Sequence, residues 1–123
     1  MERRGFYERR QQLLGEVKTE MPFLFSEYKA HAREREPNES LAFDGTILTL
    51  CFDSFFIRVS RCRGDLSVAI SFDPAEHRYY DLAEVLSDLG CEPVYSVYSL
   101  GQLAEILKPV MPELAAYSKH RHG

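Results

Sequence analysis

Residues 55–72 read FFIRVSRCRGDLSVAISF, and this stretch specifies the fold more clearly than any other part of the chain. Two runs rich in β-branched and aromatic residues, 55–62 and 66–72, flank a short turn that contains glycine. Such a pattern is typical of a β-hairpin. A third run of the same kind, ILTLCF at residues 47–52, ends only two residues before the hairpin begins. Together the three runs predict an antiparallel β-meander.

Alternation along these strands separates two faces, because successive side chains of a strand point to opposite sides of a sheet. The residues predicted to face a core are Phe55, Ile57, Val59, Leu66, Val68, Ile70 and Phe72. The opposite face is mixed and holds Phe56, Arg58, Ser60, Cys62, Ser67, Ala69 and Ser71. An antiparallel sheet can leave one face without helices. The mixed face is therefore either an open surface or covered by another helix of the same chain.

The segments on either side of the meander have helical character. Residues 3–19 predict an N-terminal helix, and the run YYDLAEVLSDLG, residues 79–90, predicts another with Gly90 as its C-terminal cap. A third is expected from residue 100, after a capping-box pattern at Ser99 and Gln102. Residues 23–33 fit a helix and a strand equally well.

Two prolines near the end of the chain predict a broken helix. Pro109 and Pro112 each lack an amide donor and clash with the preceding turn. We therefore expect one helix to end near Lys108 and a second, short helix to start around Pro112. The whole chain, 1–123, is predicted to be a single α+β domain with three or four antiparallel strands, an N-terminal helix, C-terminal helices and a frayed tail at 119–123.

Composition narrows the class of protein. The 123 residues are 45% hydrophobic and 28% charged, which is ordinary for a globular chain, and the net charge is −4. An acidic chain is poorly suited to nucleic acid, and no apolar run has the length of a membrane span. Three cysteines form an odd set, so we expect reduced thiols and a cytoplasmic location. We expect no metal and no cofactor.

Cys62 is the sharpest candidate for covalent chemistry. It lies between Arg61 and Arg63, and nearby positive charge favours a thiolate. A nucleophile also needs an oriented base, and none of the histidines lies in a recognisable motif. A small enzyme or redox sensor that uses Cys62 is the alternative interpretation. The simpler one is that Arg61 and Arg63 solubilise the end of a hairpin and discourage edge pairing.

Protein recognition is the interpretation that we favour. Phe56 and Arg58 lie on the mixed face, where they would anchor a contact, with Arg61 and Arg63 at the end of the same strand. Aromatic and arginine side chains are enriched among the residues that dominate interfaces. The partner is an unidentified protein or a second copy of this chain.

The run 55–72 followed by YYDLAEVLSDLG also resembles a class of small uncharacterised bacterial α+β proteins. The residues that carry this resemblance are Arg61, Arg63, Gly64, Tyr80, Asp81 and Leu82, and it covers roughly residues 40–90. It implies an antiparallel sheet, with residues 23–33 as an additional strand. Small acidic proteins of this kind are similar to immunity proteins, which bind and neutralise a toxin domain. For such a role the acidic balance of the chain suits a basic target, and the carboxylates expected to contribute are those of Glu34, Glu36, Glu39, Asp44, Asp73 and Glu76.

Overall fold

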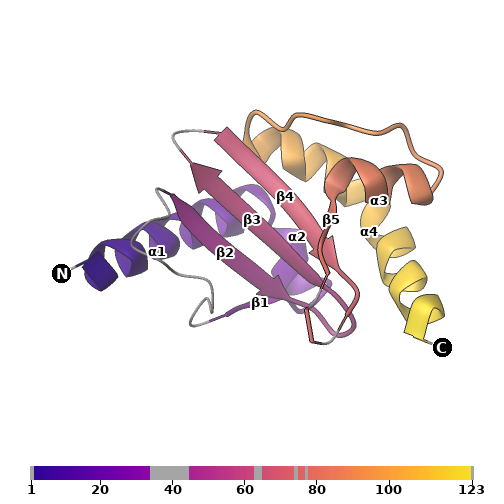
Figure 1. The fold of residues 1–123 in the computed structure, drawn as a ribbon, viewed down its shortest axis with the longest axis horizontal. Coiled ribbons are helices and arrows are strands. Elements are labelled where there is room, and N and C mark those ends of the chain that lie inside the picture. The colour runs from indigo at the N-terminus through magenta and orange to yellow at the C-terminus, as the bar shows by residue number, and fades with distance from the viewer. Residues whose placement is uncertain (1, 34–44, 63–64, 74, 77, 123) are drawn as a thin grey trace.

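The structure is a computed structural model that describes residues 2–33, 45–62, 65–73, 75–76 and 78–122, with side chains described for 8–117 within these ranges. It shows an α+β fold in which helices pack against an antiparallel sheet (Figure 1). The helices are α1 (Glu2–Glu20), α2 (Pro22–Ser26), α3 (Leu82–Asp88) and α4 (Leu100–His122). The strands are β1 (His31–Ala32), β2 (Thr46–Cys51), β3 (Phe56–Cys62), β4 (Asp65–Ser71) and β5 (Tyr80–Asp81).

The sheet is a meander in which every strand pairs antiparallel with its neighbour in the sequence, in the order β1-β2-β3-β4-β5. The three strands expected from the sequence are confirmed to within one residue at each end. Among the described residues the sheet has five strands rather than three or four, because β1 and β5, of two residues each, extend it at its two edges. Phe52 donates a backbone hydrogen bond to Phe55 at 2.9 Å, which closes the tight turn between β2 and β3.

Helices α1, α2 and α4 lie on one face of the sheet, and α3 lies at its β5 edge (Figure 1). The core is the layer between them. On β3, Ile57 and Val59 are buried between their cross-strand partners on β2 and β4. The predicted core face is confirmed, with Leu66 half-buried at its end. The helices contribute the remaining buried residues, among them Leu13, Val17, Leu24, Leu86, Leu103, Leu107 and Leu114.

The segment 23–33, which the sequence left undecided, is divided between both structures. Its first part belongs to α2, with Pro22 at the first helical position, where a missing amide donor is harmless. Lys29 then adopts a left-handed conformation with φ 59°. Ala30 donates a backbone hydrogen bond to the Leu24 carbonyl at 3.0 Å, which turns the chain into β1. The helical interpretation is therefore right for residues 23–26 and the strand interpretation for residues 31–32 alone.

The prediction of a broken C-terminal helix is wrong, because α4 runs through both Pro109 and Pro112. Both prolines are exposed, whereas Leu107, Val110 and Met111 on the same stretch are buried. A proline inside a helix costs about 3 kcal/mol, and the burial of this apolar stripe offsets that cost. Figure 1 shows α4 changing direction between its two halves, as helices do at proline.

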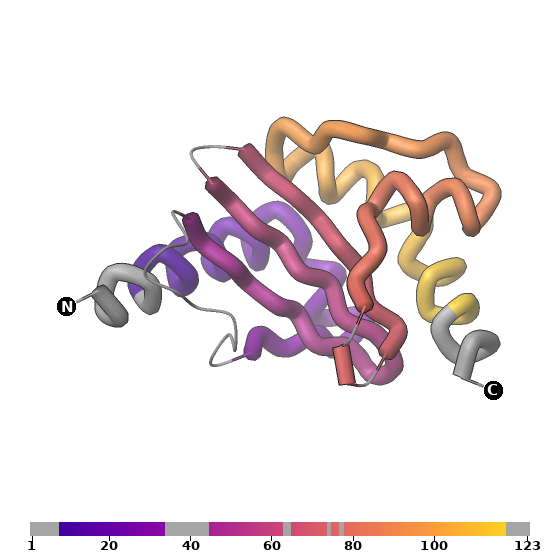
Figure 2. Tube along the Cα trace, viewed as in Figure 1, coloured from indigo at the N-terminus to yellow at the C-terminus, as the bar shows by residue number. Residues whose placement is uncertain are grey.

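Helix ends follow the local sequence closely. Gly90 has a φ of 80° after α3, and its amide donates to the Ser87 carbonyl at 3.0 Å, as expected of a C-terminal cap. The Ser99 side chain accepts the Gln102 amide at 3.1 Å, which confirms half of the capping box at the start of α4. Between these helices, segment 91–99 returns along the outside of the molecule (Figure 2). None of the helices in the described ranges has the length and apolar character of a membrane-spanning segment.

Candidate functional site

The candidate site lies on the helix-free face, defined as the face of β2, β3 and β4 that points away from α1, α2 and α4 (Figure 1). The alternation of β3 places Phe56, Arg58, Ser60 and Cys62 on this face, as the sequence predicts. All four side chains are half-buried, whereas the residues between them face the core. In the described part of the chain, helices occupy only the opposite face and the β5 edge, so the alternative of a covering helix is not realised there.

Arg58 stands at the centre of this face and is held by a tyrosine ring. Its cross-strand neighbours are Thr49 on β2, which is buried, and Ala69 on β4, which is half-buried. Tyr79, in the segment just before β5, lies against the guanidinium group, with 3.8 Å between Cζ of Arg58 and the ring centroid. A cation over an aromatic face is attracted by the ring quadrupole. The tyrosine thus fixes the position of the arginine.

Glu76 connects this pair to the other edge of the sheet. It accepts hydrogen bonds from the Tyr79 hydroxyl and from the guanidinium of Arg33, the residue that follows β1. The turn that presents Glu76 is closed by its own amide, which donates to the Asp73 carbonyl at 2.8 Å. Glu76 has a φ of 56°, a conformation that costs a non-glycine residue roughly 1–2 kcal/mol. The ion pair and the tyrosine contact stabilise this turn against that strain.

Electrostatics of the site follow from these contacts. Burial acts to raise the pKa of Glu76, but the hydrogen bonds from Arg33 and Tyr79 outweigh burial and hold that pKa below its ordinary value of 4.5. Burial, together with the hydrogen bond to Glu76, raises the pKa of the Tyr79 hydroxyl. At neutral pH the glutamate is therefore ionised and the tyrosine is a neutral donor.

Among the described residues, Arg58 differs from Arg33 in forming no ion pair, although Glu76 lies within its electrostatic reach. Arg33 is paired with Glu76, and Arg61 is paired with Glu16; among the described residues Arg58 takes part in neither pair. Its Nε is buried and has no hydrogen-bond partner there. We call the set formed by Arg33, Phe56, Arg58, Glu76 and Tyr79 the arginine–tyrosine cluster. Phe56 joins it because the Arg33 guanidinium lies 5.7 Å from its ring centroid.

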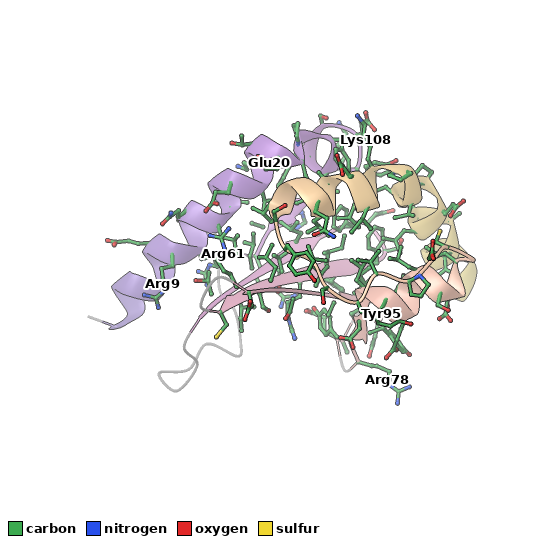
Figure 3. The ribbon with its side chains drawn as sticks, turned by 90° about the horizontal axis from the view of Figure 1, so that it is seen from above. Arg9, Glu20, Arg61, Arg78, Tyr95 and Lys108 are labelled. Atoms are coloured by element: carbon green, nitrogen blue, oxygen red, sulfur yellow. The ribbon has the colours of Figure 1, made fainter. Side chains whose placement is uncertain are left out.

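The other residues predicted for the site are not gathered here. Arg61 lies opposite Leu66 on the helix-covered face and donates to both oxygens of Glu16 on α1, at 2.9 and 3.1 Å. Figure 3 shows Arg61 turned towards α1. These hydrogen bonds, opposed by partial burial, lower the pKa of the Glu16 carboxyl. Arg61 is thus bound to a helix rather than free to solubilise the hairpin, and Arg63 lies outside the described residues.

The predicted reactive thiol, Cys62, lies outside the arginine–tyrosine cluster. Cys62 lies on the helix-free face at the end of β3, next to Asp65 across the hairpin. The strand register places a histidine, His31, opposite Cys51 and not opposite Cys62.

Of the six carboxylates predicted to contact a basic partner, Glu76 belongs to the cluster and Asp73 to its turn, whereas Glu34, Glu36, Glu39 and Asp44 lie outside the described residues. Within the described ranges no three His, Cys, Asp or Glu side chains gather as metal ligands would, and Cys51, Cys62 and Cys91 form no disulfide.

Sequence reasoning missed Arg33 and Tyr79. In the sequence, Tyr79 and Tyr80 open the run YYDLAEVLSDLG that predicts a helix. In the structure Tyr80 pairs with the core-facing Ile70, so that Tyr79, one residue earlier, reaches the other side of the sheet. Alternation at a two-residue strand leaves too weak a pattern to find from the sequence alone.

A second surface feature is an open groove of about 910 Å³ between α1, the start of α4 and the end of β3, lined by Glu16, Glu20, Arg61 and Tyr98 among others. Tyr98 and nearby Tyr95 are 81% and 84% exposed and lie on segment 91–99; Figure 3 shows Tyr95 on this segment. The Gln102 side chain accepts the Tyr98 amide at 2.6 Å and donates to the Ser96 carbonyl at 3.4 Å. The Gln102 side chain thus occupies the Tyr98 N–H and the Ser96 carbonyl, two backbone groups that a further strand pairing along this segment would need.

Comparison with known proteins gives no relative. No family model matches the chain, and neither the curated proteins nor the solved structures contain a match.

Proposed function

We propose that this protein binds another protein through its helix-free face, with the arginine–tyrosine cluster at the centre of the contact, and that it neutralises or regulates that partner as immunity proteins do. The observation that supports this most directly is Arg58, which is held over Tyr79 on a face without helices and takes part in neither ion pair described above. Arginine and aromatic residues at the centre of a surface commonly dominate binding energy.

Preorganisation strengthens the argument. Binding costs free energy when flexible side chains must be ordered at an interface, at about 0.5–1.5 kcal/mol for each long side chain. In this cluster Tyr79 already orders Arg58, and Glu76 already orders Arg33 and Tyr79. A partner would therefore meet a surface whose main contact groups are in place before it arrives.

The overall charge favours a basic protein as the partner. A net charge of −4 attracts a cationic molecule over a distance and speeds encounter more than it sets final affinity. A nuclease toxin domain would have this character. A second copy of this chain is the competing occupant, and the mass of the protein in size-exclusion chromatography distinguishes the two.

The alternative proposal, an enzyme or redox sensor that uses Cys62, makes a separate prediction. It requires a thiol whose reactivity exceeds that of an ordinary cysteine at neutral pH. Because His31 lies opposite Cys51 rather than Cys62, thiol titration should compare Cys51→Ser with Cys62→Ser. If the Cys62 thiol reacts as slowly as a model thiol, this alternative fails.

Affinity capture with matched variants tests the binding proposal. Tagged wild type and a Phe56→Ala, Arg58→Ala double variant are incubated with native lysate, and bound proteins are identified by mass spectrometry. Arg61→Ala is the control for Arg58, because it removes an arginine from the opposite face of the same strand. Tyr98→Ala is the control for Phe56, because it removes an exposed aromatic residue elsewhere.

We expect a stoichiometric partner that both controls retain and the double variant loses. Equal capture by all variants would refute the helix-free face as the binding surface. Loss in the two controls alone would move the contact to the groove beside α1.

A further inference from the structure

We infer that the partner presents a carboxylate to Arg58, so that a single acidic side chain of the partner completes the arginine–tyrosine cluster. This inference rests on the proposed function and specifies the chemistry of its contact. It does not follow from the acidic charge of the whole chain, which by itself suggests only that the partner is basic.

The first argument is the unused hydrogen-bonding capacity of Arg58. A guanidinium group carries five N–H donors and no acceptor. Nε of Arg58 is buried without a hydrogen-bond partner in the described part of the chain, and the two Nη groups are not buried in this way. Tyr79 lies against the guanidinium at 3.8 Å from its ring centroid. The N–H bonds lie in the plane of the guanidinium, so a ring over its face leaves them available at its edge.

The second argument is the charge count of the cluster. It contains two arginines and one glutamate, and Glu76 is committed to Arg33 through an ion pair whose side chains are 17% and 20% exposed. Glu76 also lies within electrostatic reach of Arg58, but its single negative charge balances only one of the two arginines. A carboxylate of charge −1 balances the other and can accept two parallel hydrogen bonds from the fork. A phosphate group carries about −1.5 to −2 at neutral pH and would leave excess negative charge beside Glu76.

The third argument concerns the shape of the partner segment. Phe56 and Arg58 are two residues apart on one strand, so their side chains rise from the same face roughly 7 Å from each other. An extended segment with an acidic residue and an apolar residue at the same spacing can contact both at once. The expected recognition pattern is therefore an acidic residue two positions from an apolar one.

A peptide-display selection tests the inference. Wild-type protein is used to select binders from a library of random peptides, and the selected peptides are synthesised for affinity measurement. We expect Asp or Glu to be enriched two positions from an apolar residue. Arg58→Gln should weaken these peptides at least tenfold, in the range typical of hydrogen bonds to charged groups. Arg58→Lys should fall between, because lysine keeps the charge and loses the planar fork, and Arg61→Gln should have no effect.

A double-mutant cycle makes the result independent of any general effect of the substitution on the fold. Replacing the acidic residue of the peptide with Gln or Asn should weaken binding to wild type and leave binding to Arg58→Gln almost unchanged. A peptide with phosphoserine at the same position should bind no better than the carboxylate.

The other outcomes distinguish this inference from the proposed function. Peptides that need Phe56 but show no coupling to Arg58 would overturn the carboxylate contact and leave the binding face intact. Tighter binding of the phosphoserine peptide would refute the charge count. If no selected peptide depends on Phe56 or on Arg58, both the face and the carboxylate contact are wrong.

Discussion

The two faces of β3 are held in place by different forces. On the helix-covered face, Ile57 and Val59 are almost completely buried among apolar side chains of both neighbouring strands and of the helices. On the helix-free face, Phe56 and Arg58 are half-buried and are contacted by Arg33 and Tyr79, which reach them from the ends of distant segments. One strand thus takes part in an apolar core and in a network of charged and aromatic groups.

The two faces differ in how much they contribute to stability. Apolar burial stabilises the fold at about 25 cal/mol for each Å² removed from water. The network contributes less, because charge desolvation offsets much of its attraction, and it keeps a buried donor of Arg58 unsatisfied.

The largest effect is expected for the covered face. Ile57→Ala should lower the free energy of unfolding by about 2–5 kcal/mol, because it leaves a cavity where the side chain is 0% exposed. Urea denaturation measures the change. Ser60→Ala, on the opposite face of the same strand, is the control and should change stability by less than about 0.5 kcal/mol. Equal losses in the two variants would mean that the faces do not differ as described.

The next effect tests the network. Glu76→Gln should cost about 1–2 kcal/mol at pH 7, since it removes the charge that accepts hydrogen bonds from Arg33 and Tyr79. The pKa of Glu76 is lower in the folded protein than its ordinary value of 4.5. Its contribution is therefore present above about pH 4.5 and is lost as the pH falls through the folded-state pKa.

Chemical denaturation of wild type and Glu76→Gln at several pH values checks this sign. The difference between them should be constant from pH 8 to 6 and shrink below the ordinary value of 4.5. Glu84→Gln, an exposed residue in the first turn of α3, is the control. A difference that grows on acidification would contradict the assignment.

A smaller effect is expected at the edge of the covered face. Arg61→Gln should lower stability by at most a few tenths of a kcal/mol, because its pair with Glu16 is 30% and 43% exposed and is screened by water and salt. Thermal unfolding of wild type and Arg61→Gln at about 0.15 M and about 0.5 M NaCl measures this loss of stability at low and high screening. The difference from wild type should decrease in high salt. A loss that is insensitive to salt would show that Arg61 contributes by packing.

The smallest effect on stability is expected for the residue that we assign to binding. Arg58→Met keeps most of the apolar stem and removes both the contact with Tyr79 and the unsatisfied Nε. The lost cation–π attraction, about 0.5–2 kcal/mol, is of the same order as the relieved donor, about 1–3 kcal/mol. Stability should thus stay unchanged or rise slightly in urea denaturation. Arg33→Met, which breaks an ion pair, is the matched comparison and should destabilise.

Much of the central fold could be predicted from the sequence. Strands β2, β3 and β4, their two faces and the core-facing residues follow from local alternation, and the cap at Gly90 follows from its neighbours. The path of α4 could not, because the propensity of Pro109 and Pro112 argues against a helix that only burial of the adjacent stripe maintains. The candidate site was half predicted: Phe56 and Arg58 lie where expected, whereas Arg61 lies on the other face.

The sequence by itself determined which residues share a face, because alternation is a property of the extended backbone and needs no knowledge of distant segments. Only the tertiary structure decided how each charge is used. Arg33 meets Glu76 across 43 positions of sequence, and Arg61 meets Glu16 across 45. Such pairs form only after sheet and helices have packed, since the positions of α1 and of the edge strands bring these groups together. The ring of Tyr79 over Arg58 has the same origin.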